Sequence, residues 1–158
     1  MVKTKTLAAS GAALALAATL LAGASGPAGA APRGEVGAAV VCGDLAYLSD
    51  PANATGQTTV AQATGDTGTA QIRAGWYNGK RYGWAKASSY AYNSLHVMFE
   101  VDVNGDRKAD CRYWKAVTDR IYTAGKATHS SSAVAFRACL LFDPAHSCNA
   151  AATKTGWW

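Results

Sequence analysis

Apolar and polar residues alternate along much of the chain from Gln71 onward, as expected of β-strands. The clearest case is the segment 96–103. Its apolar set is Val97, Phe99, Val101 and Val103, and the alternate set is His96, Met98, Glu100 and Asp102. Because successive side chains of a strand point to opposite faces, we predict that the first set is buried and the second faces water or a ligand.

Turn residues divide this region into hairpins. Asn78-Gly79 lies between aromatic residues, which is a strong signal for a two-residue hairpin turn. A second turn at 104–106 leads to a return strand over 111–117, and a further strand is expected over 133–141. Since no stretch after residue 30 keeps a helical period, we predict an all-β fold, a small antiparallel β-sandwich or barrel.

The preceding segment, 49–69, has a different composition. It is dominated by Asp, Pro, Asn, Thr, Gly, Gln and Ala and has no large apolar residue. We interpret it as a long polar loop within a single β domain over 40–158. Residues 31–39 are small and are expected to form a flexible N-terminal lead.

The first thirty residues have the three parts of a secretory signal peptide. Lys3 and Lys5 precede an apolar stretch from Leu7 to Leu21, and Ala28-Gly29-Ala30 supplies small residues for cleavage before Ala31. A membrane anchor is the alternative, but this stretch is shorter than the roughly 20 residues that cross a bilayer. We therefore expect a secreted, extracellular protein with no stable membrane insertion after cleavage.

All four cysteines lie in the part predicted to be exported. An even number of cysteines in an oxidising environment indicates two disulfides, for which three pairings exist. We favour Cys139 with Cys148 across a short loop that contains Pro144, and hence Cys42 with Cys111. Zinc is not favoured, because no Cys-x-x-Cys pair occurs.

Net charge argues against one class of partner. Of the 15 Lys and Arg residues, Lys3 and Lys5 would leave with the signal, so 13 basic and 10 acidic side chains give a formal charge of +3. The basic residues are scattered singly or in pairs and interleaved with Asp, whereas nucleic-acid binding needs a concentrated basic surface. We expect no nucleic-acid partner, and a monomer.

The segment 102–110 carries oxygen-bearing side chains at positions 1, 3, 5 and 9. These are Asp102, Asn104, Asp106 and Asp110. Such a set is suited to calcium, and the segment resembles the DxNGDGxxD loops of secreted calcium-binding β proteins. Arg107 stands where that pattern usually has Gly, and Tyr113 at position 12 excludes an EF-hand. The alternative is a hairpin turn without metal, since Asp, Asn and Gly favour turns.

Aromatic residues are dense between positions 76 and 92. We predict binding residues among them, namely Trp76, Tyr77, Tyr82 and Trp84, with Tyr90 and Tyr92 in the same set. Exposed Trp and Tyr can stack on sugar rings or anchor a protein partner. The alternative is that they fill the core and pair across strands. Trp157 and Trp158 are expected to pack back onto the sheet near the second disulfide.

Catalytic signals are few. No Gly-x-Ser-x-Gly motif occurs, and His96 with Glu100 is the best acid–base candidate on one strand face. The leading hypothesis is thus a secreted non-catalytic binding domain for a cell-envelope or extracellular glycan or protein. One alternative is a small secreted hydrolase using His96 and Glu100. Another is a protease inhibitor or antibacterial toxin, for which the segment 140–147 beside a disulfide would be the exposed loop.

Three further segments carry a resemblance to known proteins. They are Tyr82-Gly83-Trp84-Ala85-Lys86, Arg137-Ala138-Cys139 and Thr155-Gly156-Trp157-Trp158. Together with the Ala-rich signal they resemble small secreted actinobacterial proteins of uncharacterised function. The resemblance covers roughly residues 68–158 and implies secretion and a disulfide-linked β domain. It implies no activity.

Overall fold

A computed structural model describes residues 39–158. The predicted signal peptide, 1–30, and residues 31–38 of the predicted lead lie outside the described residues. The strands are β1 (Tyr47–Leu48), β2 (Thr55–Gly65), β3 (Gly68–Tyr77), β4 (Lys80–Tyr90), β5 (His96–Asp102), β6 (Cys111–Ala116), β7 (Gly125–Ala127), β8 (Ala135–Leu141) and β9 (Thr153–Lys154). Two short 3-10 helices, η1 (Pro51–Asn53) and η2 (Cys148–Ala150), complete the fold.

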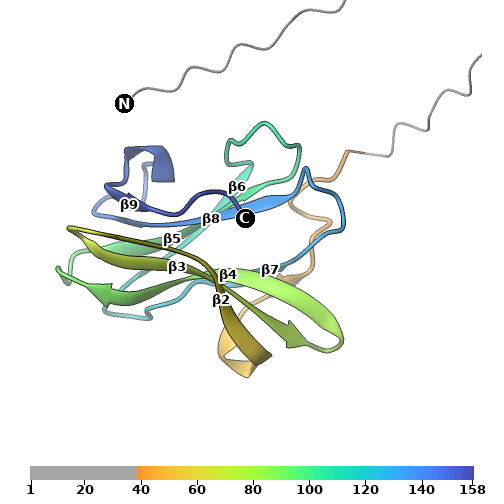
Figure 1. Ribbon diagram of the computed structural model, residues 1–158, viewed down its shortest axis with the longest axis horizontal. Coiled ribbons are helices and arrows are strands. Elements are labelled where there is room, and N and C mark those ends of the chain that lie inside the picture. The colour runs from red at the N-terminus through yellow and green to blue at the C-terminus, as the bar shows by residue number, and fades with distance from the viewer. Residues whose placement is uncertain (1–38) are drawn as a thin grey trace, which may run out of the picture. The chain divides into compact units, whose positions relative to one another are not determined.

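The strands form two antiparallel sheets that lie one above the other (Figure 1). One has the order β1-β7-β4-β3-β2 and the other the order β6-β5-β8-β9. The core between them includes Ile72 and Ala85 of the first sheet, and Phe99 and Phe136 of the second. At Gly83 an added Cβ would lie 2.7 Å from the Phe136 ring, so the glycine allows the sheets to approach. The predicted all-β sandwich is confirmed.

Both predicted hairpins are present. Asn78 and Gly79 have φ values of 48° and 73°, the left-handed conformation that a type I′ hairpin turn requires at both central positions. They join β3 to β4. In the other sheet β5 lies between β6 and β8, so that Phe99 is opposite Tyr113 on one side and Ala138 on the other. The two strands predicted after residue 110 are therefore confirmed.

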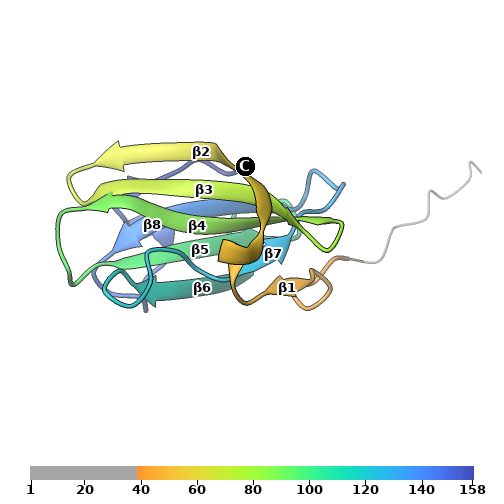
Figure 2. The ribbon, with the colours of Figure 1, turned by 90° about the horizontal axis from the view of Figure 1, so that it is seen from below.

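The interpretation of 49–69 as a long polar loop is wrong. Residues 55–65 form β2, which lies at an edge of the five-stranded sheet and pairs only with β3 (Figure 2). Every residue of β2 is exposed or half-buried. An edge strand exposed to water needs no large apolar residues, and its threonines suit a pleated, solvated surface.

The predicted orientation of β5 is half right. The first set, Val97 to Val103, is buried as predicted, but Met98, Glu100 and Asp102 are also completely buried. The segment that follows β8 covers Met98 and Glu100, and the 104–107 turn covers Asp102. Met98 packs there with Cys139, Cys148 and neighbouring residues in a separate apolar cluster.

The two disulfides have the predicted pairing. Cys42 is bonded to Cys111 and Cys139 to Cys148, with sequence separations of 69 and 9 residues. The longer link holds the segment before β1 against β6. Beside it, the Lys126 ammonium group donates hydrogen bonds of 2.9 Å to the carbonyl oxygens of Cys42 and Leu45. Burial lowers the pKa of Lys126, because it removes the charged ammonium group from water.

Candidate functional site

The four predicted aromatic binding residues differ in exposure. Trp76 is 52% exposed and Tyr77 is half-buried, but Tyr82 and Trp84 are buried. Tyr82 and Trp84 lie on the outer face of the five-stranded sheet, where Leu48 and Ala54 cover them. Tyr82 and Trp84 are therefore core residues, which was the alternative interpretation, because the β1–η1 segment folds over that face.

Exposed rings gather instead at the end of the sandwich where β4 and β8 finish. Tyr92, Trp114 and Phe142 are 52%, 49% and 54% exposed. The Tyr92 and Phe142 ring centroids are 5.5 Å apart, and the His96 ring meets Trp114 edge-on at 5.1 Å. His96 Nδ1 lies 3.2 Å from the Phe142 carbonyl oxygen. The two ring pairs are thus joined through His96, and we name these four residues the aromatic patch.

Strand register brings the members of the aromatic patch together. His96 is opposite Leu141, so Phe142 follows directly beside it when β8 ends. Trp114 is opposite Met98, two residues along β5 from His96, and therefore lies on the same face. Tyr92 comes from the turn between β4 and β5.

A pocket of about 300 Å³ adjoins the aromatic patch at Phe142. Its lining residues are Thr67, Leu140, Leu141, Phe142, Asp143, His146, Ala150, Ala151 and Ala152. Most are apolar, while the His146 ring Nδ1 and the Asp143 carboxylate, 3.0 Å apart, supply polar groups. A small apolar pocket with a few polar groups is the usual form of a ligand site.

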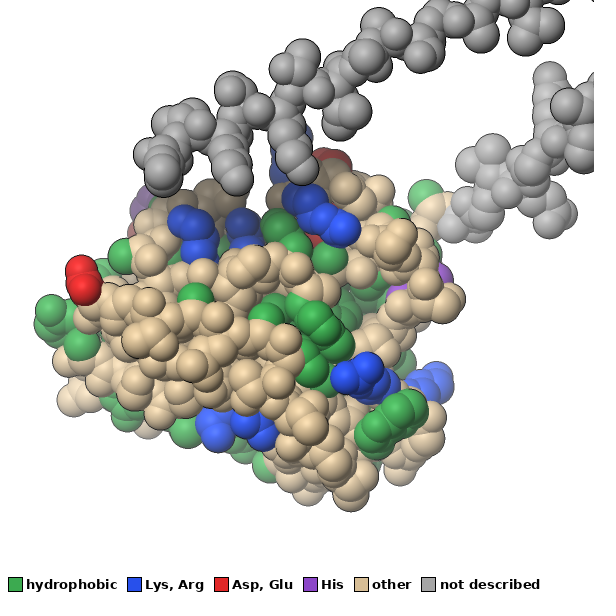
Figure 3. Space-filling view, viewed as in Figure 1, with side chains coloured by type: hydrophobic (Ala, Val, Ile, Leu, Met, Phe, Trp, Pro, Cys, Tyr) green, Lys and Arg blue, Asp and Glu red, His purple; other side chains and the backbone are tan. Residues whose placement is uncertain are grey.

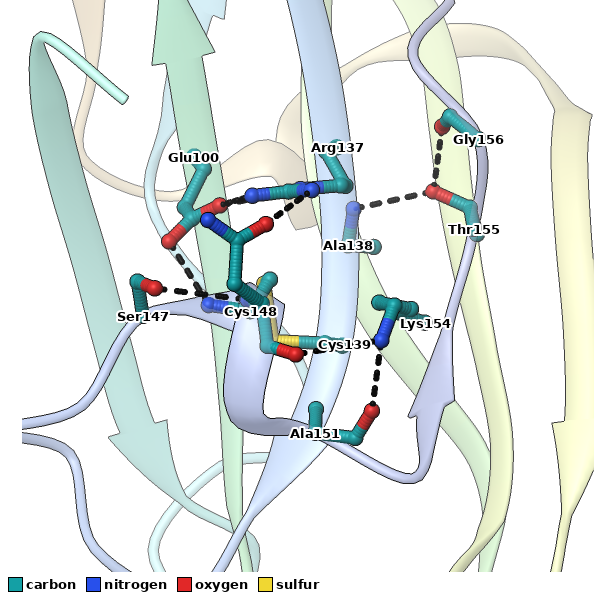
Figure 4. Close-up of a disulfide and its surroundings, with 11 residues drawn as sticks. Glu100, Arg137, Ala138, Cys139, Ser147, Cys148, Ala151, Lys154, Thr155 and Gly156 are labelled. Atoms are coloured by element: carbon teal, nitrogen blue, oxygen red, sulfur yellow. Dashed lines mark hydrogen bonds and ion pairs between the residues drawn. A yellow bond between two sulfur atoms is a disulfide. The ribbon is translucent and has the colours of Figure 1, made fainter. Parts of the chain in front are cut away.

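The loop that carries Phe142 is fixed at its base by the second disulfide and a buried ion pair. Figure 4 shows Glu100 and Arg137 facing each other from β5 and β8, with the disulfide beside them. Arg137 Nε and Nη2 lie 3.0 and 2.5 Å from Glu100 Oε2, and the Cys148 N–H donates to Oε1 at 2.8 Å. Arg137 also donates to Asn149 and stacks on Trp157 at 4.4 Å. Trp157 thus packs on Arg137, beside the ion pair at this disulfide, as expected. Trp158 also packs back onto the sheet, but on Phe136 near the start of β8 and not beside the disulfide.

His96 and Glu100 do not share an environment. His96 borders water and belongs to the aromatic patch, whereas both carboxylate oxygens of Glu100 accept hydrogen bonds in the interior. Because Glu100 is completely buried and pairs with Arg137, its role is structural and its carboxylate does not reach the surface where a ligand could bind.

The segment proposed as an inhibitor loop folds into a tight turn. The Asp143 side chain accepts from the Ala145 N–H at 2.8 Å, and the His146 N–H donates to the Asp143 carbonyl at 3.2 Å. Arg112 donates to the Ala145 carbonyl at 3.2 Å. The loop is therefore closed on itself and held against β6, which differs from an extended strand that could enter a protease cleft.

In the segment predicted to bind calcium, the Asp102 carboxylate is surrounded by protein donors. Oδ1 accepts from the N–H groups of Asn104 and Gly105 at 3.0 and 2.7 Å. Oδ2 accepts from the N–H and guanidinium groups of Arg107 at 2.9 and 3.0 Å. Burial raises the pKa of Asp102, but these hydrogen bonds outweigh it and hold the pKa below its ordinary value.

Other oxygens of the segment are also engaged. Asp110 accepts from the Val103 N–H and the Asn104 side-chain amide, at 2.8 and 3.1 Å. Asn104 Oδ1 and Asp106 Oδ1 accept from the N–H groups two residues further on. Within residues 39–158, no three His, Cys, Asp or Glu side chains are arranged to hold a metal ion. Calcium stays a prediction, and the Arg107 contact supports the alternative of a metal-free turn.

A calcium titration distinguishes these alternatives. Because the Arg107 guanidinium already neutralises Asp102, we expect millimolar calcium to leave the melting temperature unchanged within about 1 °C. Differential scanning calorimetry with calcium and with chelator measures this, and magnesium serves as the control cation. A rise of several degrees with calcium alone would show a calcium site and contradict this expectation.

Comparison of the chain with models of protein families, with curated proteins and with solved structures finds no match. The fold defines the chain as a disulfide-linked, two-sheet antiparallel β protein. In the part of the chain that the structure describes, no helix is long and apolar enough to cross a membrane.

Proposed function

We propose that this protein is a secreted, non-catalytic binding domain whose aromatic patch binds an extracellular or cell-envelope glycan. The observation that carries the proposal is a group of three half-exposed rings, in which Tyr92 contacts Phe142 and Trp114 contacts His96, and His96 contacts the Phe142 carbonyl. Grouped exposed aromatic side chains are unusual on a protein surface without a partner. Their flat faces match the C–H faces of sugar rings, and the Tyr hydroxyl and Trp N–H can bond to sugar hydroxyls.

The aromatic patch is built to bind with little loss of entropy. Its rings contact one another in two pairs, and the Phe142 loop is fixed by the Cys139–Cys148 disulfide and the Glu100 ion pair. A surface ordered before binding spends less of its interaction energy on ordering side chains. The adjoining pocket, with Asp143 and His146, offers polar groups for sugar hydroxyls that extend past the rings.

Charge favours a glycan over a polyanionic nucleic acid as the partner. On the face drawn in Figure 3, Lys and Arg side chains stand in separate small groups and do not form one continuous basic surface. Mild positive charge also permits attraction to anionic polymers of a cell envelope.

The test is retention of the secreted protein on insoluble cell-wall material and on a panel of polysaccharides. The variant combines Trp114→Ala and Phe142→Ala. Because truncating a central aromatic contact commonly costs about 2 kcal/mol or more, we expect binding to weaken at least about 30-fold. Melting temperature checks that the variant is folded.

Trp76→Ala is the matched control, because Trp76 is as exposed as the rings of the aromatic patch but lies outside it. It should bind like the unaltered protein. Weaker binding of Trp76→Ala with normal binding of the double variant would move the site to the β3–β4 hairpin. Failure of the unaltered protein to bind any glycan above an unrelated secreted control would overturn the proposal.

A further inference from the structure

A second groove, of about 320 Å³, lies at the end of the sandwich where β4 and β8 begin. It is lined by Arg81, Thr128, His129, Ser130, Ser131, Ser132, Val134, Phe136 and Trp158. Arg81 is the second residue of β4, and the aromatic patch lies beyond its last residue, Tyr90. At about 3.3 Å per residue, Arg81 lies roughly 30 Å from the end of β4, and Phe136 in the groove lies roughly 20 Å along β8 from Phe142 in the aromatic patch, so the groove is a distinct site.

The formal charge of the groove is positive. Arg81 supplies it, and none of the lining residues is Asp or Glu. Every other arginine in the described range donates a hydrogen bond to a protein oxygen, namely Arg73, Arg107, Arg112, Arg120 and Arg137. Among residues 39–158, Arg81 has no side-chain hydrogen bond or ion-pair partner. Its guanidinium group is thus available to an anion.

The Arg81 guanidinium is nevertheless held in place. It lies over the Trp158 ring, 5.3 Å from the centroid. Trp158 is itself anchored, because its N–H and carbonyl pair with Phe136 of β8 at 2.9 and 2.8 Å, and the two rings are 5.8 Å apart. A guanidinium stacked on an indole keeps its planar fork free for a carboxylate, which it can bind with two parallel hydrogen bonds.

The opposite wall of the groove presents hydrogen-bond donors. The Ser131 N–H donates to His129 Nδ1 at 3.0 Å, so the neutral ring carries its proton on Nε2, as a donor. Arg107 holds the same loop through the carbonyl oxygens of Ser132 and Ala133, at 3.2 and 3.3 Å. The donors of the loop are therefore positioned before a ligand arrives.

We propose that this groove binds a small anionic sugar of the uronic-acid class. The carboxylate would pair with the Arg81 guanidinium, and the apolar face of the sugar ring would contact Val134 and the part of the Trp158 indole that Arg81 leaves uncovered. The sugar hydroxyls would bond to His129 Nε2–H and the serine hydroxyls. This inference does not rest on the proposed function, because it concerns different residues at the other end of the fold.

The test is a titration of the protein with sodium glucuronate, followed by the NMR shift of the Trp158 indole N–H. Glucose is the neutral probe and sodium acetate the probe without a sugar ring. We expect saturable binding of glucuronate, at least tenfold weaker binding of glucose and of acetate, and weaker binding as salt concentration rises. Arg81→Gln should lower glucuronate affinity at least tenfold.

Lys80→Gln is the matched control, because it removes the same charge from the neighbouring exposed position outside the groove. If Lys80→Gln and Arg81→Gln lowered glucuronate affinity equally, the attraction would be a general effect of positive charge, and the proposed site would be overturned. Equal binding of glucose or of acetate would overturn the assigned ligand class. His129→Gln, which leaves Arg81 in place, should weaken glucuronate binding several-fold, and an unchanged affinity would remove the histidine from the site.

The two proposed sites can fail separately. The Trp114→Ala and Phe142→Ala variant should bind glucuronate normally, and Arg81→Gln should bind the insoluble glycan normally. A loss of glucuronate binding in the first variant would contradict the groove as an independent site.

Discussion

Replacing Glu100 with glutamine is expected to lower the free energy of unfolding by about 3–5 kcal/mol. Glutamine has nearly the same shape, but it leaves the buried Arg137 guanidinium without its counter-charge. Stability is lost also because a neutral amide oxygen is a weaker acceptor than a carboxylate for the Cys148 N–H. Urea unfolding at neutral pH with intact disulfides measures the change.

Asp119→Asn is the control for Glu100→Gln, because Asp119 is an exposed carboxylate. It should change the free energy of unfolding by less than about 0.5 kcal/mol. If Glu100→Gln were as mild as this control, the Glu100–Arg137 pair would not stabilise the fold as described. Proteolysis within the 140–147 loop offers a second readout, since Glu100 anchors the base of that loop.

Removing the Cys42–Cys111 disulfide is expected to cost about 4 kcal/mol of stability, and removing Cys139–Cys148 about 3 kcal/mol. The difference follows from the sequence separations of 69 and 9 residues, because a longer link removes more entropy from the unfolded chain. Paired Cys→Ser variants unfolded in urea without reductant measure both costs. If the variant without Cys42–Cys111 lost less stability than the variant without Cys139–Cys148, the explanation by chain entropy would be contradicted.

Loss of the Cys42–Cys111 link should also loosen the segment before β1. Once the disulfide is absent, Lys126 remains as a polar tie to this segment, through the carbonyl oxygens of Cys42 and Leu45. Hydrogen exchange of the Leu45 and Leu48 amides should therefore rise in that variant, while exchange in β5 should not.

Local sequence signals predicted the parts of the fold that depend on local chemistry. Asn78-Gly79 specified its hairpin because few residues accept two left-handed positions in succession. The alternation from Val97 to Val103 identified both the strand and its core face. The disulfides followed from the even number of cysteines and their spacing.

Features that depend on distant segments could not be read in the same way. Glu100 and Asp102 are polar, so alternation assigned them to water, but covering segments and donors such as Arg137 and Arg107 bury them. Trp84 is covered by residues some thirty positions earlier in the chain. The pattern of β2 resembles a loop because only one edge of it is paired.

The candidate site was only partly visible in the sequence. Tyr92 belonged to the aromatic set, but Trp114 lies on β6 and Phe142 directly after β8, and only the register of both strands with β5 brings them beside His96. Aromatic residues beside turns and at strand ends, such as Phe142 before Asp143-Pro144, are the signal that could have identified them. Nothing local to Arg81 indicates that Trp158 stacks on it.

The outer border of β2 has a consequence for behaviour in concentrated solution. Its eleven residues carry no charged side chain, so an identical strand from another molecule would meet no electrostatic repulsion there. Two register shifts, between Thr55 and Thr58 and between Thr59 and Ala61, interrupt the straight row of amide and carbonyl groups. Such irregularities hinder edge-to-edge pairing and fibril growth, and β2 has them where other edge strands often have lysines.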